Sequence, residues 1–195
     1  MEAPELKLRM ATPADAAALL EIYAPYVRET AVTYEYEVPT ETEFAARVAK
    51  TLEAYPYLAA EQDGELVGYA YAGRFHARKA YDWSAEASIY VRRDLRGRGV
   101  GRRLYGALES LLKRQNVQGV HAVIAYPERE DEYLTWASVR FHTRMGYEQI
   151  GRSRRCAYKF GRWYDMVWME KALGTFPELP APFVPLPMLP RDPSL

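Results

Sequence analysis

The sequence predicts an α/β fold in which helices pack against one mixed β-sheet. Apolar residues recur at the helical period in several stretches, whereas other stretches are short alternating or β-branched runs typical of strands. An Asp63-Gly64 pair between two such runs is a strong hairpin signal. The chain has 195 residues, 49% of them hydrophobic, which suits one globular domain with a core. The predicted order is β-α-α-β-β-β-α-β-α-β-β.

The first strand covers residues 6–10, and two helices with capping signals follow it. Thr12-Pro13-Ala14-Asp15 supplies an N-cap, a proline at the first helical position and an acidic residue three positions after the cap. We expect this helix to stop before Pro25. Thr40-x-x-Glu43 is a second capping box, and it opens a helix that ends before Pro56.

The middle of the chain combines a hairpin with a strand-loop-helix unit. Residues 57–61 and 65–74 form the two strands on either side of the Asp-Gly turn. Residues 85–91 form a strand that enters a loop rich in arginine and glycine. The helix after the loop, over residues 101–115, is indicated by leucines that repeat on one face.

The last elements lead into a proline-rich segment. A buried strand at 120–125 precedes a helix at 134–145 with Gly146 as C-cap, and strands at 147–160 and 163–169 meet at Gly161-Arg162. The domain is therefore expected to span residues 1–174. Residues 175–195 hold seven of the 13 prolines, which excludes helix and central strand. This segment is a disordered tail or an extended arm, and its apolar side chains favour the arm.

The loop after residue 91 has the features of a pyrophosphate site. Positions without a Cβ allow close backbone approach, and N–H groups converge at a helix N-terminus beside arginines. A mononucleotide P-loop is excluded because no Gly-Lys-Ser/Thr precedes the helix, and a dinucleotide fingerprint is excluded because Arg102 stands where glycine is needed. The pattern that remains is Arg96-x-x-Gly99-x-Gly101.

This pattern resembles the pyrophosphate loop of the Gcn5-related N-acetyltransferases (GNAT), and the resemblance covers roughly residues 6–172. Further short motifs look like the phosphinothricin and methionine sulfoximine/sulfone N-acetyltransferase subfamily. They are Thr30-Ala31-Val32-Thr33-Tyr34-Glu35, Ala70-Tyr71-Ala72-Gly73, residues 77–83, Glu86-x-x-Ile89-Tyr90-Val91, Phe141-His142-x-x-Met145-Gly146-Tyr147 and residues 161–165.

The resemblance implies acetyl-CoA as co-substrate and indicates which residues bind it. Ile89 and Val91 would offer backbone groups to the pantetheine arm, and the Val91 N–H would serve as oxyanion donor. Thr135 stands where relatives commonly carry asparagine, three residues before Ser138. The expected cofactor-binding residues are Ile89, Tyr90, Val91, Arg96, Gly97, Arg98, Gly99, Val100, Gly101, Arg102, Thr135 and Ser138. Alternatively, the Arg98 side chain is a solvated surface charge.

Glu86 and His142 are the candidate catalytic residues. Strand alternation puts Glu86 on one face with Ser88 and Tyr90, and a carboxylate within an apolar strand is costly unless it is solvated or paired. The resemblance places a general base here, usually acting through water; the alternative is a structural Glu paired with arginine. His142 stands where the subfamily carries histidine, and it could take the amine's proton or protonate the leaving sulfur. A solvent-side helix histidine is the alternative.

Acceptor recognition requires a cation and an aromatic wall. Arg78 with Tyr34 and Tyr81 could hold a carboxylate or phosphinate, since arginine matches such oxyanions bidentately. Tyr34 is also open to a role in the core or in a dimer interface.

The leading hypothesis is an acetyl-CoA-dependent N-acetyltransferase that acetylates a small amino acid or an analogue by direct attack in a ternary complex. The alternatives are a protein or peptide N-acetyltransferase, for which the acidic segment 128–132 is the one hint, and a non-catalytic acyl-CoA-binding module. Lys+Arg and Asp+Glu both total 26, so no net charge recruits nucleic acid or an acidic membrane. The single cysteine, Cys156, and the lack of a signal pattern favour the cytoplasm, and no His/Cys cluster predicts a metal site. We expect a homodimer.

Overall fold

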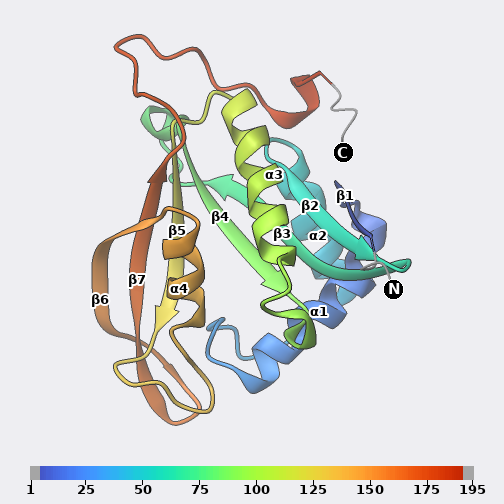
Figure 1. Ribbon diagram of the computed structural model, residues 1–195, viewed down its shortest axis with the longest axis vertical. Coiled ribbons are helices and arrows are strands. Elements are labelled where there is room, and N and C mark those ends of the chain that lie inside the picture. Colours follow the sequence, from blue (N-terminus) through green and yellow to red (C-terminus); the bar gives the residue numbers. More distant parts are fainter. Residues whose placement is uncertain (1–4, 191–195) are drawn as a thin grey trace.

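The computed structural model describes residues 5–190. In that part of the chain, four α-helices and seven strands occur in the predicted order, which confirms the mixed α/β fold (Figure 1). The helices are α1 (Ala16–Glu29), α2 (Glu41–Leu52), α3 (Val100–Arg114) and α4 (Ala137–Arg144). The strands are β1 (Leu6–Met10), β2 (Tyr57–Gln62), β3 (Glu65–Arg74), β4 (Ser84–Val91), β5 (Gly119–Tyr126), β6 (Glu148–Lys159) and β7 (Arg162–Ala172).

The strands form one sheet in the order β1-β2-β3-β4-β5-β7-β6. All neighbouring pairs are antiparallel except β4 and β5, which are parallel. β4 pairs with β3 over Ala85–Val91 but with β5 only over Ser84–Glu86, opposite Gly119–His121. The two central strands therefore separate beyond Glu86, and the sheet contains a fork.

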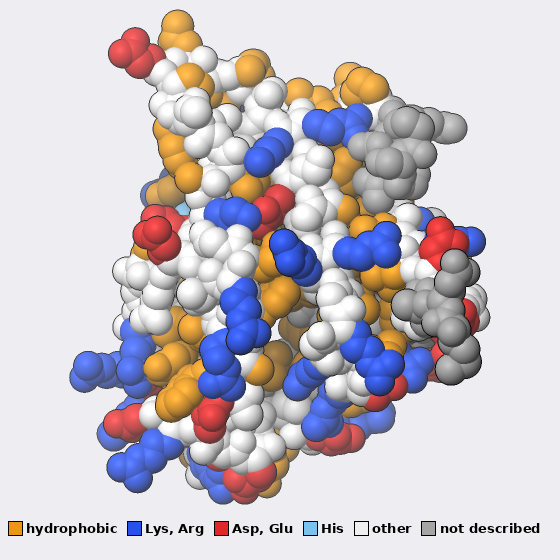
Figure 2. All heavy atoms as spheres, in the orientation of Figure 1, with side chains coloured by type: hydrophobic (Ala, Val, Ile, Leu, Met, Phe, Trp, Pro, Cys, Tyr) orange, Lys and Arg blue, Asp and Glu red, His pale blue; other side chains and the backbone are white. Residues whose placement is uncertain are grey.

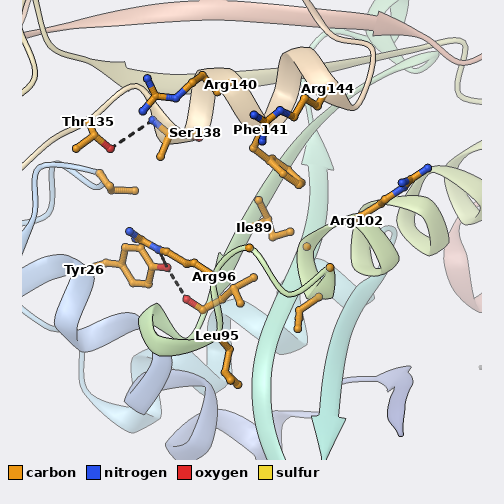
Figure 3. Close-up of a pocket in the computed structure, with 17 residues that line it drawn as sticks. Tyr26, Ile89, Leu95, Arg96, Arg102, Thr135, Ser138, Arg140, Phe141 and Arg144 are labelled. Carbon is orange, nitrogen blue, oxygen red and sulfur yellow. Dashed lines mark hydrogen bonds between the residues drawn. The ribbon is translucent and has the colours of Figure 1, made fainter. Parts of the chain in front are cut away.

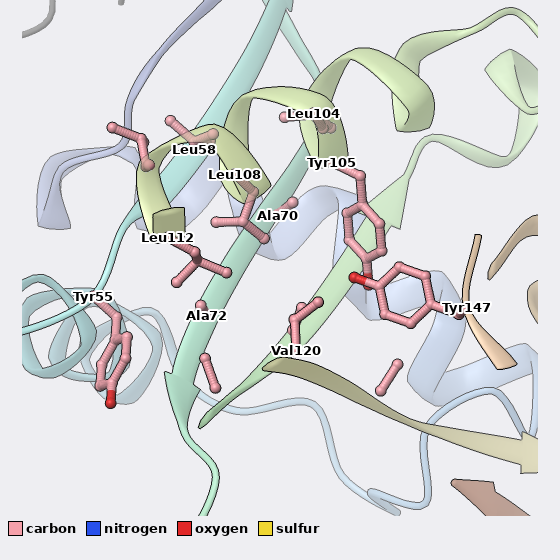
Figure 4. Close-up of a cluster of buried hydrophobic side chains, with 14 of the residues drawn as sticks. Tyr55, Leu58, Ala70, Ala72, Leu104, Tyr105, Leu108, Leu112, Val120 and Tyr147 are labelled. Atoms are coloured by element: carbon pink, nitrogen blue, oxygen red, sulfur yellow. The ribbon is translucent and has the colours of Figure 1, made fainter. Parts of the chain in front are cut away.

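Helices cover both faces of the sheet. α1 and α2 pack against β2 and β3 on one face, and α3 packs against β2, β3 and β4 on the other, next to α4 (Figure 1). Figure 4 shows Leu104, Leu108 and Leu112 of α3 directed at the alanines of β3. These small side chains let the helix lie close to the sheet. None of the helices within residues 5–190 combines the length and the apolar character needed to cross a membrane.

The first helix is longer than the sequence indicated. The expected stop before Pro25 is wrong, because α1 continues through Pro25 to Glu29. Proline removes one backbone hydrogen bond from a helix interior. The turn that follows it buries Tyr26 and Val27 against the sheet, and this packing offsets that loss.

The fourth helix is shorter than expected at its N-terminal end. The predicted range 134–145 is corrected to Ala137–Arg144, because carboxylates hold the preceding residues in a turn. Asp131 accepts the backbone N–H groups of Tyr133 and Leu134, both at 2.8 Å, and Glu130 accepts that of Trp136 at 2.8 Å. Aspartate side chains commonly compete with helical hydrogen bonding in this way.

The proline-rich segment lies as an extended arm along the end of α3 up to Pro190; residues 191–195 of the predicted tail lie outside the described residues. Val184 exchanges hydrogen bonds with Gln115, whose carboxamide also donates to Ala54. The Trp83 indole donates to the Ala181 carbonyl at 2.7 Å. The arm thus links the end of α3 to the start of β4.

Candidate active site

The fork between β4 and β5 leaves backbone groups of β4 without a strand partner. The Arg92 N–H donates to Val67 on β3, so the even-numbered residues of β4 direct their backbone groups toward β3. The odd-numbered residues Ile89 and Val91 therefore direct theirs into the fork. The Val91 carbonyl accepts a hydrogen bond from the Tyr26 hydroxyl at 2.5 Å. Both backbone groups of Ile89 and the N–H of Val91 therefore face the fork beyond the last β4–β5 pair.

An outer pocket of about 390 Å³ lies between the arginine-glycine loop and α4. Figure 3 shows Arg96 and Tyr26 on one side of it and Arg140 and Arg144 on the opposite side. On the surface, Lys and Arg side chains gather around a hollow between α3 and α4 (Figure 2). The pocket is thus suited to a ligand with several phosphate groups.

Glycines give the loop the backbone shape that the sequence suggested. Gly97 and Gly99 have φ of 78° and 86°, in the left-handed region, and Gly99 is the N-cap of α3. A Cβ built on Gly99 would meet nothing within 4 Å, so the space above it is open to a ligand. At Gly101 a Cβ would lie 3.2 Å from Phe141 and 3.3 Å from Ile89, so the absence of a side chain there avoids crowding with these two residues.

Most predicted cofactor residues line this outer pocket. The matching residues are Ile89, Val91, Arg96, Gly97, Gly99, Val100, Gly101, Arg102, Thr135 and Ser138. Tyr90 and Arg98 do not, because the Tyr90 ring packs among the tyrosines under α1 and Arg98 is exposed. Sequence reasoning missed Tyr26, Arg140 and Arg144. The two arginines lie one helical turn apart, and that spacing was the available signal.

A smaller inner pocket of about 60 Å³ lies in the fork itself. It shares Val32, Ile89 and Ser138 with the outer pocket, so the two pockets adjoin. The inner pocket also contacts Tyr105 and His142. A ligand held by the loop can therefore extend past Ile89 into the fork.

His142 is buried, not on the solvent side of its helix. Its side chain is 3% exposed, with Nδ1 2.8 Å from the Ser138 carbonyl oxygen and Nε2 2.9 Å from the Tyr105 hydroxyl. Burial lowers the pKa of His142 to about 4, although the bond to Ser138 acts in the opposite direction. The imidazole is therefore neutral at pH 7.

Glu86 lies at the base of the fork on the opposite face of the sheet from α3. It is partly buried and is the last residue of β4 that pairs with β5, opposite His121. Burial raises the pKa of the Glu86 carboxyl, and the nearby His76 partly counteracts this. Glu86 lines neither of the two pockets.

The structure does not gather the predicted acceptor residues in one pocket. The Tyr34 hydroxyl donates to the Asp165 carbonyl at 2.5 Å, beside the end of β5. Tyr81 packs against Phe75 and His76 near the start of β4, and Arg78 is exposed at the beginning of the same turn. Tyr34 is thus at the far end of β5 from the other two.

The acidic segment 128–132 is largely neutralised by arginines. Arg162 contacts both Asp131, at 3.0 Å, and Glu132, at 2.8 Å, and Arg140 lies 2.9 Å from Glu130. The segment therefore presents no concentrated negative charge. Within residues 5–190, no three His, Cys, Asp or Glu side chains lie close enough together to hold a metal ion.

The family model for the acetyltransferase (GNAT) domain matches residues 8–168. The chain belongs to the GNAT acetyltransferase family. It is therefore an N-acetyltransferase that uses acetyl-CoA.

Known relatives of this acetyltransferase share most of its length. It is 35% identical to the phosphinothricin N-acetyltransferase of Streptomyces viridochromogenes over 185 residues, or 95% of this chain and 94% of that one. It is 32% identical to the L-methionine sulfoximine/L-methionine sulfone acetyltransferase of Salmonella typhimurium, over 86% and 95% of the two chains. A phosphinothricin acetyltransferase from Sinorhizobium meliloti, solved with acetyl-CoA, superposes with a TM-score of 0.79 at 33% identity, covering 87% and 89%.

The described residues fit acetyl-CoA as the family requires. The open space above Gly99, the N-terminus of α3 and Arg96 suit a pyrophosphate, and the unpaired backbone of Ile89 suits an amide-bearing arm. The inner pocket has room for a group of about the size of acetyl.

Proposed function

We propose that the enzyme acetylates the amine of a small amino acid or amino-acid analogue, such as phosphinothricin, methionine sulfoximine or methionine sulfone, by direct attack in a ternary complex. The names of the relatives at 32–38% identity support this class of acceptor. The observation that carries the proposal is the fork. Its two adjoining pockets would place a thioester next to Ile89, within reach of an amine that enters from the Glu86 side.

Backbone groups of β4 would stabilise the charge that develops during transfer. We propose the Ile89 N–H as the oxyanion donor, in place of the Val91 N–H expected from the sequence. Ile89 lines both pockets, whereas Val91 lines only the outer one and its carbonyl is bonded to Tyr26. A fixed backbone donor needs no reorganisation when the oxyanion forms.

Glu86 would act as the general base that removes the first proton from the substrate ammonium. Its raised pKa brings the carboxylate closer to the pKa range in which general bases work well near neutrality. It touches neither pocket, so we propose that the proton reaches it through water. Arg78 and Tyr81, in the turn that precedes the same strand, are the proposed contacts for the acceptor's acid group.

The competing functions receive less support from the site. A peptide acceptor guided by an acidic groove does not fit the segment 128–132, whose carboxylates are bound by Arg162 and Arg140. A homodimer, a cytoplasmic location and the absence of nucleic-acid and membrane partners stay predictions.

The test is a thiol-release assay with acetyl-CoA and a panel of free amino acids, phosphinothricin, methionine sulfoximine, methionine sulfone and short peptides. We expect rapid turnover with one or more of the amino-acid analogues. Acetylation of peptides alone would replace the small-molecule proposal with the peptide alternative. CoA binding without turnover of any amine would favour the non-catalytic module.

A further inference from the structure

The buried pair Tyr105 and His142 belongs to a hydrogen-bond chain that runs from the inner pocket into the protein. Tyr105 extends from α3 toward the sheet (Figure 4) and is fully buried. Both Tyr105 and His142 nevertheless line the inner pocket. This hydrogen-bond chain consists of the Tyr105 hydroxyl, the His142 ring and the Ser138 carbonyl. The Tyr105 oxygen lies 2.9 Å from His142 Nε2, and His142 Nδ1 lies 2.8 Å from the Ser138 oxygen.

The Ser138 carbonyl fixes which groups donate and which accept in these hydrogen bonds. A carbonyl oxygen only accepts hydrogen bonds, so His142 Nδ1 must carry a proton and donate it to Ser138. In a neutral imidazole the other nitrogen is then unprotonated, and Nε2 accepts the hydrogen bond from Tyr105. The Tyr105 proton is consequently engaged with His142, and the lone pairs of the Tyr105 oxygen are left to accept a further hydrogen bond.

We propose that Tyr105 is a catalytic residue that accepts a proton from the reacting nitrogen, while His142 acts behind it as a positioning residue that stores this proton. The inference rests on the proposed acetyl transfer in the same fork. In this arrangement His142 cannot protonate the leaving group directly. The Nε2 atom of His142 carries no proton, and the proton on Nδ1 is hydrogen-bonded to the Ser138 carbonyl oxygen.

In the proposed transfer the reacting nitrogen loses two protons, one to Glu86 and one to Tyr105. Glu86 takes the first proton from the ammonium, and the neutral amine attacks the thioester carbon, which leaves a cationic nitrogen and an oxyanion. One nitrogen-bound proton moves to the Tyr105 oxygen as the hydroxyl proton of Tyr105 moves to His142 Nε2. The oxyanion then re-forms the carbonyl and breaks the carbon–sulfur bond. The thiolate takes a proton from Tyr105, which recovers its own from His142, and Glu86 later releases the first proton to water.

Tyr147 provides a matched control for Tyr105. Its ring packs 5.9 Å from that of Tyr105 and 5.2 Å from that of His142, and it is similarly buried. Its hydroxyl lies near Glu109, outside the chain, and it lines neither pocket. Tyr147→Phe therefore removes a hydroxyl from the same cluster without interrupting the proton route.

The experiment compares Tyr105→Phe, His142→Phe, their double variant and Tyr147→Phe, each first checked for folding by circular dichroism. With acetyl-CoA and the amine that wild type uses best, we expect Tyr105→Phe and His142→Phe to lower kcat about 10²-fold or more. The KM for acetyl-CoA should stay within about twofold. The double variant should lose little beyond either single variant, because the two residues act as one unit. Tyr147→Phe should retain wild-type kcat.

A wild-type rate in Tyr105→Phe, or losses that multiply in the double variant, would overturn the relay. If the variants do not fold, a proton inventory of wild type in single turnover decides instead. A rate that curves downward with deuterium content supports two protons in flight, and a linear dependence contradicts it. Failure of wild type to acetylate any amine would instead reject the proposed function itself, so the two failures are distinguishable.

Discussion

Glu86 and His121 are partners on adjacent parallel strands, at the last rung where β4 and β5 are joined. Beyond this rung the strands diverge, so the proposed base lies at the point where the fork begins. Tyr105 and His142 lie on the opposite face, toward α3 and α4. The sheet therefore separates two proton-handling groups, and a reacting amine in the fork would meet one from each side.

Replacing Glu86 with glutamine should lower kcat by about 10²–10⁴-fold at neutral pH, since an amide cannot take a proton. Binding of CoA, measured by calorimetry, should stay nearly unchanged because Glu86 lines neither pocket.

The wild-type rate should also depend on pH. The carboxylate form is the active one and burial raises its pKa, so activity should fall with acidification at a pH above the usual value of 4.5. That acid limb should be missing from the residual activity of Glu86→Gln. An unaltered rate in the variant would mean that Glu86 is structural.

Gly99 and Gly64 form a matched pair for testing the phosphate loop. Both have positive φ, 86° and 83°, and a Cβ at either position would meet nothing within 4 Å. Valine at either position should cost about 1–3 kcal/mol of stability through backbone strain. Only Gly99→Val should also weaken CoA binding, because its side chain enters the pocket.

Thermal unfolding with and without CoA separates the two effects. At a CoA concentration 100 times Kd, the free energy of unfolding of wild type and of Gly64→Val should rise by about 2.7 kcal/mol. The rise for Gly99→Val should be far smaller at the same concentration. An equal gain in all three proteins would argue against a phosphate site at this loop.

Arg78→Ala should raise the KM for the acceptor about ten- to a hundredfold, since a lost charge-assisted contact costs about 1.5–3 kcal/mol. The KM for acetyl-CoA should hardly change. Arg98→Ala, at an exposed arginine outside both pockets, is the control. A parallel rise of both KM values in Arg78→Ala would show that this residue supports the fold, and the acceptor site would have to be sought elsewhere.

His142 should make folding stability depend on pH. Its pKa falls to about 4 in the folded protein, below the ordinary value of 6.5, because burial disfavours the charged ring. Between pH 4 and 6.5 the unfolded chain therefore binds more protons than the folded protein. The contribution of the neutral ring to the free energy of unfolding is present above pH 6.5 and is lost as the pH falls toward 4. The loss should reach about 3 kcal/mol. Urea unfolding across this range should show a shallower dependence in His142→Phe, and identical slopes would contradict a buried neutral ring.

The sequence was sufficient for the order of elements and for the loop, because periodicity, capping boxes and glycine spacing are local signals. It was insufficient where two elements meet. Pro25 did not end α1, since packing of Tyr26 and Val27 outweighs one lost hydrogen bond. The contacts of Tyr26 with Val91 and of Tyr105 with His142 join residues far apart in the chain, and no local pattern predicts them.

The C-terminal arm has a consequence for the order of folding. Its partners Gln115, Trp83 and Ala54 precede their contacts in the arm by 69, 98 and 132 positions, so the ribosome completes all of them first. The junction between the end of α3 and the start of β4 can close only after residues 181–186 have emerged. We therefore expect a nascent chain to form the sheet before the arm contacts the end of α3 and the start of β4. A translational stall before residue 181, or a bulky fusion there, would leave the start of the strand that carries Glu86 without its contact with the arm.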